Sequence, residues 1–169
     1  MERMKDIPVG EDPEAIAIEG VPGIAAKIYV ANGVGTISVI NGLIETKEAK
    51  DIPVGRQGCA SDSSTYFRLC DIRILWDKLY VANSAFNTIS VIKESSDKKE
   101  PNDITSGPAP VHMALDIVKR KIYVVNRDYN TVSVINGLTD TKETNDIFVG
   151  DQPVNIAFRP ILRLEQMID

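Results

Sequence analysis

The sequence predicts an all-β fold made from repeated units of four antiparallel strands, and three observations carry this prediction. A segment that opens with Lys and Tyr occurs three times, at 27–55, 78–107 and 121–150. Its apolar runs, such as "KIYVAN" and "TISVIN", are short and rich in β-branched residues, as in strands. The spacing from the Thr that opens the second run to the closing Gly is constant at 19 residues: Thr36 to Gly55, Thr88 to Gly107, Thr131 to Gly150.

The length of the repeat indicates β-propeller blades. Tyr29, Tyr80 and Tyr123 follow one another at offsets of 51 and 43 residues, inside or near the range of about 40–50 residues that is typical of blades. The apolar positions fall on both sides of each strand, so each sheet needs a cover on both faces. A sheet stacked between two similar sheets meets that need.

The strands can be assigned in order. The Tyr-led and Thr-led strands are joined by "NGVG", "NSAFN" or "NRDYN", which suits hairpin turns with left-handed backbone angles. A Gly-ended strand follows, as in "KDIPVG", and a Pro three residues later opens the next strand in three of four cases. Gly permits a sharp exit, and Pro can begin a strand where the missing N–H costs nothing.

These strands define one repeat domain over 1–169, with blades at about 11–55, 56–107 and 108–150 and partial strands at 5–10 and 153–158. Two places depart from the pattern. Gly58 stands where the second blade should have Pro, and "TYFRLCDIRIL" at 65–75 is the best candidate for its Pro-led strand. After 158 the pattern stops, and Pro160 with apolar residues spaced for one face predicts a short C-terminal helix.

Three blades cannot close a ring, because propellers have about 4–8 blades. An open row leaves the outer face of each end blade without a cover. We therefore expect self-association, or flanking blades of a longer chain, to complete a ring of six or more blades.

Composition limits the partners. With 43% hydrophobic residues, 25% charged residues and a net charge of −5, the chain is typical of soluble globular proteins. It has no basic stripe, so nucleic acid is not expected. No apolar run is long enough for a membrane span, and the first residues do not resemble an export signal. Cys59 and Cys70 are either ordinary thiols or one surface disulfide.

Few residues are candidates for chemistry. His112, the only histidine, lies on the strand expected to line the central channel, where Ala15 and Asn155 are its equivalents. One His without a second ligand or a paired carboxylate does not make a site, so a channel-lining or packing role is expected.

Asn126, Asp128 and Asn130 alternate like the first half of a calcium loop. They lack its Gly and distal Glu, and a hairpin turn explains them better. No catalytic, metal-binding or cofactor-binding residue is predicted, and no cofactor.

The combined pattern Pro-x-x-Ile-Ala, Lys-Ile-Tyr-Val-Ala-Asn, Asn-Thr-Ile-Ser-Val-Ile and Ile-Pro-Val-Gly resembles the YVTN-type β-propeller repeat over about residues 5 to 158. This resemblance implies a propeller of the kind found in surface-layer and other cell-surface or secreted proteins. Relatives range from surface scaffolds to lactonase-like and quinoprotein-like enzymes, so fold does not fix function.

We expect a non-catalytic module that binds proteins or surfaces through its variable connections, around 19–26, 56–77 and 94–103. A lactonase-like or lyase-like enzyme is the alternative, and it would require His112 to meet carboxylates or a metal from neighbouring blades. A quinoprotein-like, cofactor-binding subunit is a further alternative.

Overall fold

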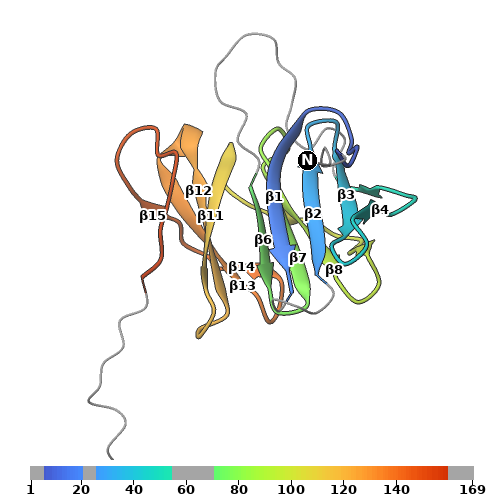
Figure 1. Ribbon diagram of the computed structural model, residues 1–169. Coiled ribbons are helices and arrows are strands. Elements are labelled where there is room, and N and C mark those ends of the chain that lie inside the picture. Colours follow the sequence, from blue (N-terminus) through green and yellow to red (C-terminus); the bar gives the residue numbers. More distant parts are fainter. Residues whose placement is uncertain (1–5, 21–25, 55–70, 160–169) are drawn as a thin grey trace, which may run out of the picture.

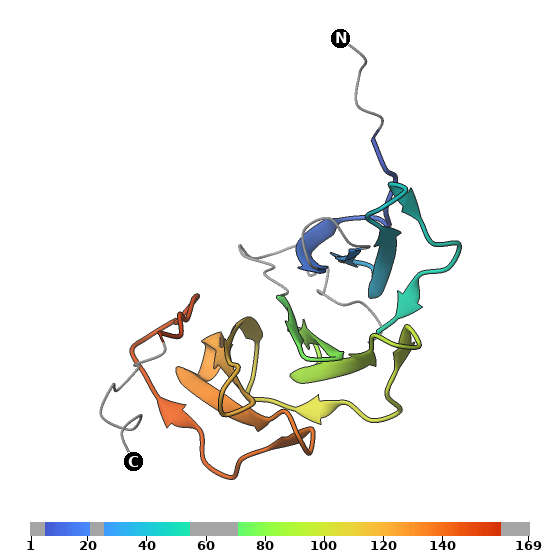
Figure 2. The same cartoon turned by 60° about the horizontal axis from the view of Figure 1, so that its bottom comes forward.

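The computed structural model describes residues 6–20, 26–54 and 71–159. Within these ranges the chain forms three antiparallel sheets, one for each sequence repeat, and a single turn of 3-10 helix. The sheets follow one another along an arc, with their innermost strands on its concave side (Figures 1 and 2). The all-β prediction and the stacking of blade-like sheets are confirmed.

The first blade contains β1 (Pro13–Glu19), β2 (Lys27–Asn32), β3 (Thr36–Asn41), β4 (Thr46–Lys47) and β5 (Ile52–Pro53). The second contains β6 (Ile72–Leu75), β7 (Lys78–Asn83), β8 (Thr88–Lys93), β9 (Lys98–Lys99) and β10 (Ile104–Thr105). The third contains β11 (Pro110–Asp116), β12 (Lys121–Asn126), β13 (Thr131–Asn136), β14 (Thr141–Lys142) and β15 (Ile147–Phe148), with the helical turn η1 (Arg127–Tyr129) between β12 and β13.

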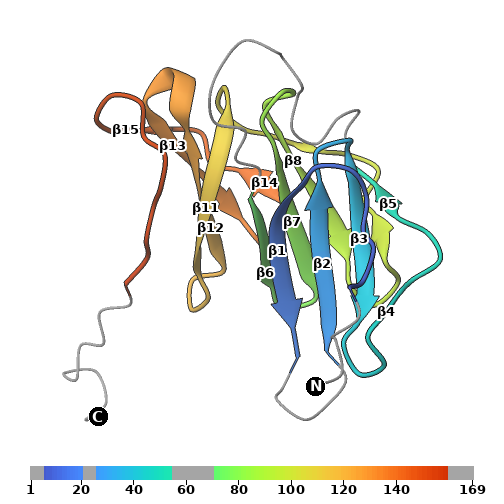
Figure 3. The same ribbon diagram turned by 45° about the horizontal axis from the view of Figure 1, so that its top comes forward.

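Each blade has four strand positions, as the repeat predicts. The Pro-led strand is innermost, the Tyr-led and Thr-led strands follow, and the outer strand is split into two short pieces that both pair with the Thr-led strand, as β4 and β5 do with β3 in blade 1 (Figure 3). Between the two pieces of blade 1, the Glu48 N–H still donates to the Val39 carbonyl at 2.7 Å. The inner strand of blade 2, β6, is the last part of the candidate segment at 65–75; the rest of that segment lies outside the described residues.

The hairpin turns use the predicted left-handed backbone. The residue before each Thr-led strand has a positive φ, namely 83° at Gly35, 56° at Asn87 and 55° at Asn130. Glycine and asparagine adopt this conformation at low cost, so the Asn and Gly of these connections are explained by the turn.

The core lies between the blades. Tyr29 and Ile37 of blade 1 share one buried cluster with Leu79 of blade 2, and Tyr80 of blade 2 shares another with Ile122 of blade 3. Each blade therefore buries apolar side chains from both faces. We call the face turned toward the following blade the forward face, and the opposite one the back face.

Polar contacts at the edge of each seam repeat as well. The Tyr29 hydroxyl donates to Asp97 Oδ1 of the next blade at 3.2 Å, and Lys27 Nζ lies 2.7 Å from Asp97 Oδ2. In the second seam Tyr80 and Lys78 contact Asp140 at 2.8 and 2.7 Å. Burial, together with the neighbouring carboxylate, raises the pKa of both tyrosines well above the ordinary value. We call this Lys, Tyr and Asp set the seam latch.

The ends of the described chain differ from the complete blades. Residues 6–10 and 153–158 carry the sequence of blade strands but form no strand pairs, so the partial strands predicted at 5–10 and 153–158 are not found as strands in the described residues. The predicted helix at 160–169, and both cysteines, lie outside the described residues. Among the described residues, no helix has the length and apolarity needed to span a bilayer.

Candidate functional site

One side-chain position recurs along the concave side of the arc. Strand register aligns Ile16, Ile72 and Met113, because each lies opposite the equivalent valine of its Tyr-led strand. The residue before each is therefore equivalent too: Ala15 in blade 1, Asp71 in blade 2 and His112 in blade 3. The equivalence of Ala15 and His112 is as predicted. Asp71 was not among the predicted site residues.

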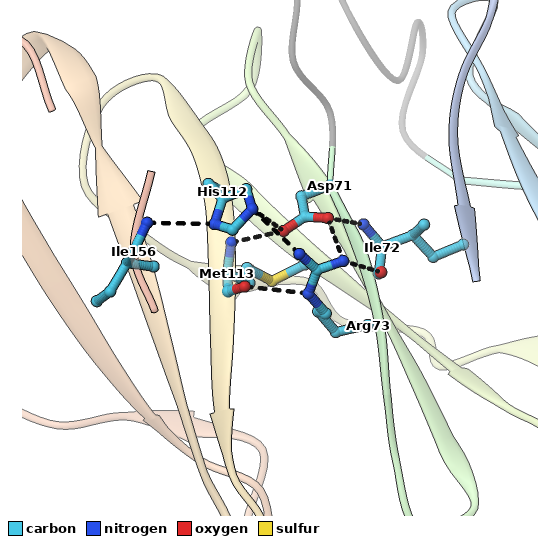
Figure 4. Close-up of polar contacts among 6 residues, drawn as sticks. All are labelled: Asp71, Ile72, Arg73, His112, Met113 and Ile156. Atoms are coloured by element: carbon cyan, nitrogen blue, oxygen red, sulfur yellow. Dashed lines mark hydrogen bonds and ion pairs between the residues drawn. The ribbon is translucent and has the colours of Figure 1, made fainter. Parts of the chain in front are cut away.

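These positions bring an imidazole and a carboxylate together across the second seam (Figure 4). His112 Nε2 lies 3.7 Å from Asp71 Oδ2. Arg73 lies two residues beyond Asp71, so its side chain projects from the same face of β6. Its Nη1 is 2.8 Å from Asp71 Oδ1, and its Nη2 is 3.1 Å from His112 Nε2. We call these three residues the seam cluster.

Arg73 and Asp71 of the seam cluster form hydrogen bonds with backbone groups of the protein. Arg73 Nε donates to the Met113 carbonyl of the next blade at 3.1 Å, and Nη1 donates to the Ile72 carbonyl at 3.2 Å. Asp71 accepts from two backbone N–H groups, that of Ile72 at 2.9 Å and that of Met113 at 2.7 Å. The cluster thus ties β6 to β11.

His112 is enclosed on both ring nitrogens. The Ile156 N–H points to Nδ1 at 3.4 Å, while Arg73 faces Nε2. A neutral imidazole has one acceptor nitrogen, so these donors compete, and in either tautomer both nitrogens face protein groups. Burial and the Arg73 charge lower the pKa of His112, while the Asp71 charge opposes that shift. His112 is therefore neutral at neutral pH.

The seam cluster is a local feature of the second seam. In the first seam the equivalents of Asp71 and Arg73 are Ala15 and Ala17, which pack against the apolar cluster there. Stacking of two blades therefore does not require the charges. The Arg73 side chain is 33% exposed and that of His112 is 21% exposed, so the cluster borders solvent on the concave side.

The predicted half-loop residues do not converge. Asn126 is buried, and its Nδ2 donates to Thr131 Oγ1 and Ser133 Oγ. Asp128 is exposed beside Arg127, and Asn130 Nδ2 donates to Asp151 Oδ1 at 3.1 Å. Each therefore has a structural partner of its own. Over residues 6–20, 26–54 and 71–159, no three His, Cys, Asp or Glu side chains are arranged to hold a metal ion.

Asn155, the remaining predicted equivalent of His112, is exposed and lies one residue before Ile156, whose N–H contacts His112. It therefore adjoins the seam cluster through its backbone neighbour. Asp71 and Arg73 were missed because no Pro marks the start of β6. The turn into the Tyr-led strand also has only two residues in blade 2, Trp76 and Asp77, so counting back from the tyrosine does not restore the register.

A second feature lies where the inner hairpins of blades 2 and 3 turn, at the lower end of the blades in Figure 1. Trp76 is 59% exposed, and the Arg120 guanidinium lies 4.5 Å from its ring centroid. Ile117 and Val118, on the same turn as Arg120, are 62% and 85% exposed. Gly137 N–H donates to the Arg120 carbonyl at 2.8 Å, which brings the neighbouring Leu138 to this end. We call these side chains, which are exposed except for the half-buried Arg120, the turn-end patch: Trp76, Ile117, Val118, Arg120, Leu138.

Comparison with known proteins identifies the fold. No protein-family model matches the chain, and no curated protein matches it. Among solved structures, hydrazine synthase of Kuenenia stuttgartiensis superposes with a TM-score of 0.69 at 15% identity, over 92% of this chain and 41% of that one.

Dihydro-heme d1 dehydrogenase NirN, in complex with DHE, gives a TM-score of 0.68 at 15% identity over 90% of this chain and 32% of that one. A streptogramin B lyase gives 0.61 at 17% identity, over 86% and 44%. This chain thus spans less than half the length of these proteins. Because they are β-propellers, the three stacked sheets are consecutive blades of the β-propeller fold.

Proposed function

We propose that the chain is a non-catalytic binding module, in which propeller blades hold a surface that recognises another protein. The observation that carries this proposal is the turn-end patch. Trp76 and the Arg120 guanidinium stacked on it are residue types enriched among those that dominate binding energy at protein interfaces, and exposed aliphatic side chains lie on the same turn as Arg120. Isolated exposed apolar residues are common on protein surfaces, whereas a cluster of them marks an interaction site.

The seam cluster supports the same proposal. The enzyme alternative needs His112 to meet a carboxylate from a neighbouring blade, and Asp71 lies within reach of it. A general base also needs a nitrogen that can take a proton from the substrate. Both ring nitrogens of His112 face protein donors, and Asp71 is committed to two backbone N–H groups. We therefore assign the cluster to joining blades 2 and 3.

We also propose a cellular location for the module. The resemblance to YVTN-type repeats favours a cell-surface or extracytoplasmic scaffold, and the quinoprotein-like alternative rests on that resemblance alone. A partner that recognises the turn-end patch would supply an apolar surface with a pocket for the indole ring, because burial of aromatic area contributes most to such contacts.

Site-specific photocrosslinking tests the proposal. A benzophenone amino acid in place of Val118 should give a discrete crosslinked protein in the native host, and the product should be lost when Trp76→Ala is added. The matched control places the same probe at Phe86, which is 48% exposed on the hairpin turn at the opposite end of blade 2. The His112→Gln variant should keep the crosslink. Equal labelling from both positions, or none from Val118, would contradict the proposal.

A further inference from the structure

The seams inside the chain show what each end face lacks. At both seams, a forward face with a Lys and a Tyr meets a back face whose β3–β4-type turn carries an Asp. That turn residue has a left-handed φ, 50° at Asp97 and 53° at Asp140. The equivalent in blade 1 is Glu45, also with φ 53°. Blade 1 therefore presents the acidic part of a seam latch, and no described blade precedes it.

The forward face of blade 3 presents the other half. Lys121 and Tyr123 occupy the latch positions, but Lys121 turns back to Glu143 of its own blade, 2.7 Å from its Nζ. The outer-strand isoleucine Ile147 is 50% exposed, whereas its equivalents Ile52 and Ile104 are 6% and 7% exposed within the seams. This face is therefore built for a seam that the described chain does not complete.

The back face of blade 1 is open along β1, whereas Val30 and Ile40 on the same face are only 8% and 6% exposed. Ile16 and Ile18 of β1 are 59% and 64% exposed. Their equivalents in the following blades pack into the seams, and Ile72 and Met113 are fully buried. The two end faces of the chain are thus complementary in apolar surface and in latch charge.

The glycines that follow the outer strands have different neighbours at the seams and at the end face of blade 3. A Cβ on Gly107 would lie 2.5 Å from Asn126 Nδ2 of the next blade, and a Cβ on Gly10 would lie 2.6 Å from Asn32 Nδ2. At Gly150 nothing lies within 4 Å. Gly150 is therefore shaped for an asparagine that a following blade would supply, and Asn32 of blade 1 is the asparagine in that position.

The two terminal segments cover parts of the end faces, and each is held there by few contacts. Residues 153–158 match the Pro-led strand of a following blade, and they are held by the Ile156 bond to His112 and by stacking of Phe158 on Tyr123 at 6.3 Å. Residues 6–10 match the outer strand of a preceding blade, and Gly10 N–H donates to Ser38 Oγ at 3.2 Å. Neither segment has strand pairs, so a paired strand can displace either one.

We propose that the forward face of blade 3 docks head-to-tail on the back face of blade 1 of a second copy of this chain. Lys121 and Tyr123 then form a seam latch with Glu45 of the second copy, in which the longer Glu replaces Asp. Strand β1 of that copy takes the place of residues 153–158, and Gly150 takes the place of its Gly10. Two copies joined in this way supply six blades, within the range of about 4–8 found in closed propellers.

A charge exchange tests this junction with the full chain. Sedimentation velocity at micromolar concentrations should show the wild type as a dimer. Lys121→Glu and Glu45→Lys should each weaken association by about tenfold or more, because each places like charges at every junction. An equimolar mixture of the two variants should recover the dimer, since every junction in the mixed pair then joins opposite charges.

The controls separate this junction from other contacts. Lys50→Glu, a charge reversal on the exposed loop between β4 and β5, should leave the dimer unchanged. Phe158→Ala should tighten the dimer, because it weakens the segment that β1 must displace. A wild type that stays monomeric would overturn the proposal. So would a dimer whose affinity neither charge reversal changes, or one that does not form again when the two variants are mixed. The latch residues Lys121, Tyr123 and Glu45 do not belong to the turn-end patch, so Trp76→Ala leaves the latch side chains unchanged, and the two charge reversals leave the patch side chains unchanged.

Discussion

At the scale of single residues, close approach decides which side chain the repeat can accept. The glycine after each outer strand was expected to permit a sharp exit, yet Gly10, Gly107 and Gly150 do not have left-handed φ angles. The requirement is space, because at Gly10 and Gly107 the asparagine of the next blade fills the position of a Cβ. That asparagine in turn donates to the Thr and Ser of its own Thr-led strand.

Alanine at two of these glycines should therefore have unequal effects. Gly107→Ala forces Asn126 to move and should cost about 1–3 kcal/mol of unfolding free energy, as overpacking does. Gly150→Ala meets open space and should change stability by less than about 0.5 kcal/mol. Urea denaturation followed by circular dichroism, at concentrations that keep the chain monomeric, measures both. Equal losses would show that the backbone, and not the neighbouring asparagine, sets the requirement.

The single histidine gives a pH-dependent prediction. The pKa of His112 is lowered in the folded protein, so its contribution to stability is present above about pH 6.5, the ordinary value, and is lost as pH falls through the folded value. The Hε1 proton resonance, unique in this chain, should titrate with a midpoint below the ordinary value.

Two substitutions assign the cause of that shift. Arg73→Gln should raise the midpoint, and Asp71→Asn should lower it further, because these charges act on the imidazole in opposite directions. A midpoint that ignores both substitutions would mean that His112 does not lie in the seam cluster.

At the scale of strands and turns, the sequence predicts the strand order well because Pro, Gly and Asn residues mark where the strands begin and where the turns lie. Pro13 and Pro110 open β1 and β11, and the residues before the Thr-led strands take left-handed angles. Before β6 no Pro marks the start of the strand, so the register of β6 could not be predicted and Asp71 was not recognised as the equivalent of His112. The seam latch was missed for another reason: its Lys and Tyr lie 60 to 70 residues from the Asp that they contact, and local patterns cannot pair residues across blades.

Matched substitutions measure the seam latch. Asp140→Ala removes the partner of both Lys78 and Tyr80 and should cost about 1–3 kcal/mol, because it leaves the buried hydroxyl of Tyr80 with a poorer acceptor. Glu45→Ala, at the same turn position of blade 1, should change the stability of the monomer by less than about 0.5 kcal/mol. Guanidinium denaturation compares the two. A loss of similar size at Glu45 would argue that the turn itself is responsible.

At the scale of the whole molecule, the chain is a row of blades. Equivalent residues are buried where they lie in a seam between two blades and more exposed where they lie on an end face. Period, register and two-sided apolar strands were enough to predict this row, because every unit repeats the same requirement. The turn-end patch could not be predicted, since Trp76 and Arg120 come from different blades and meet only after stacking. Function at this scale depends on what covers the exposed end faces and the turns.

Hydroxyl-radical footprinting with mass spectrometry tests the row of seams most directly, because it compares equivalent side chains in one experiment. The seams predict slow modification of Tyr29, Tyr80 and Met113 at every protein concentration. Tyr123 and Ile16, at the open faces, and Phe148, on the solvent side of β15, should react readily in dilute protein, and Tyr123 and Ile16 should become protected as the concentration rises. If Tyr80 and Met113 react as fast as Tyr123 and Phe148, the blades are not stacked as described.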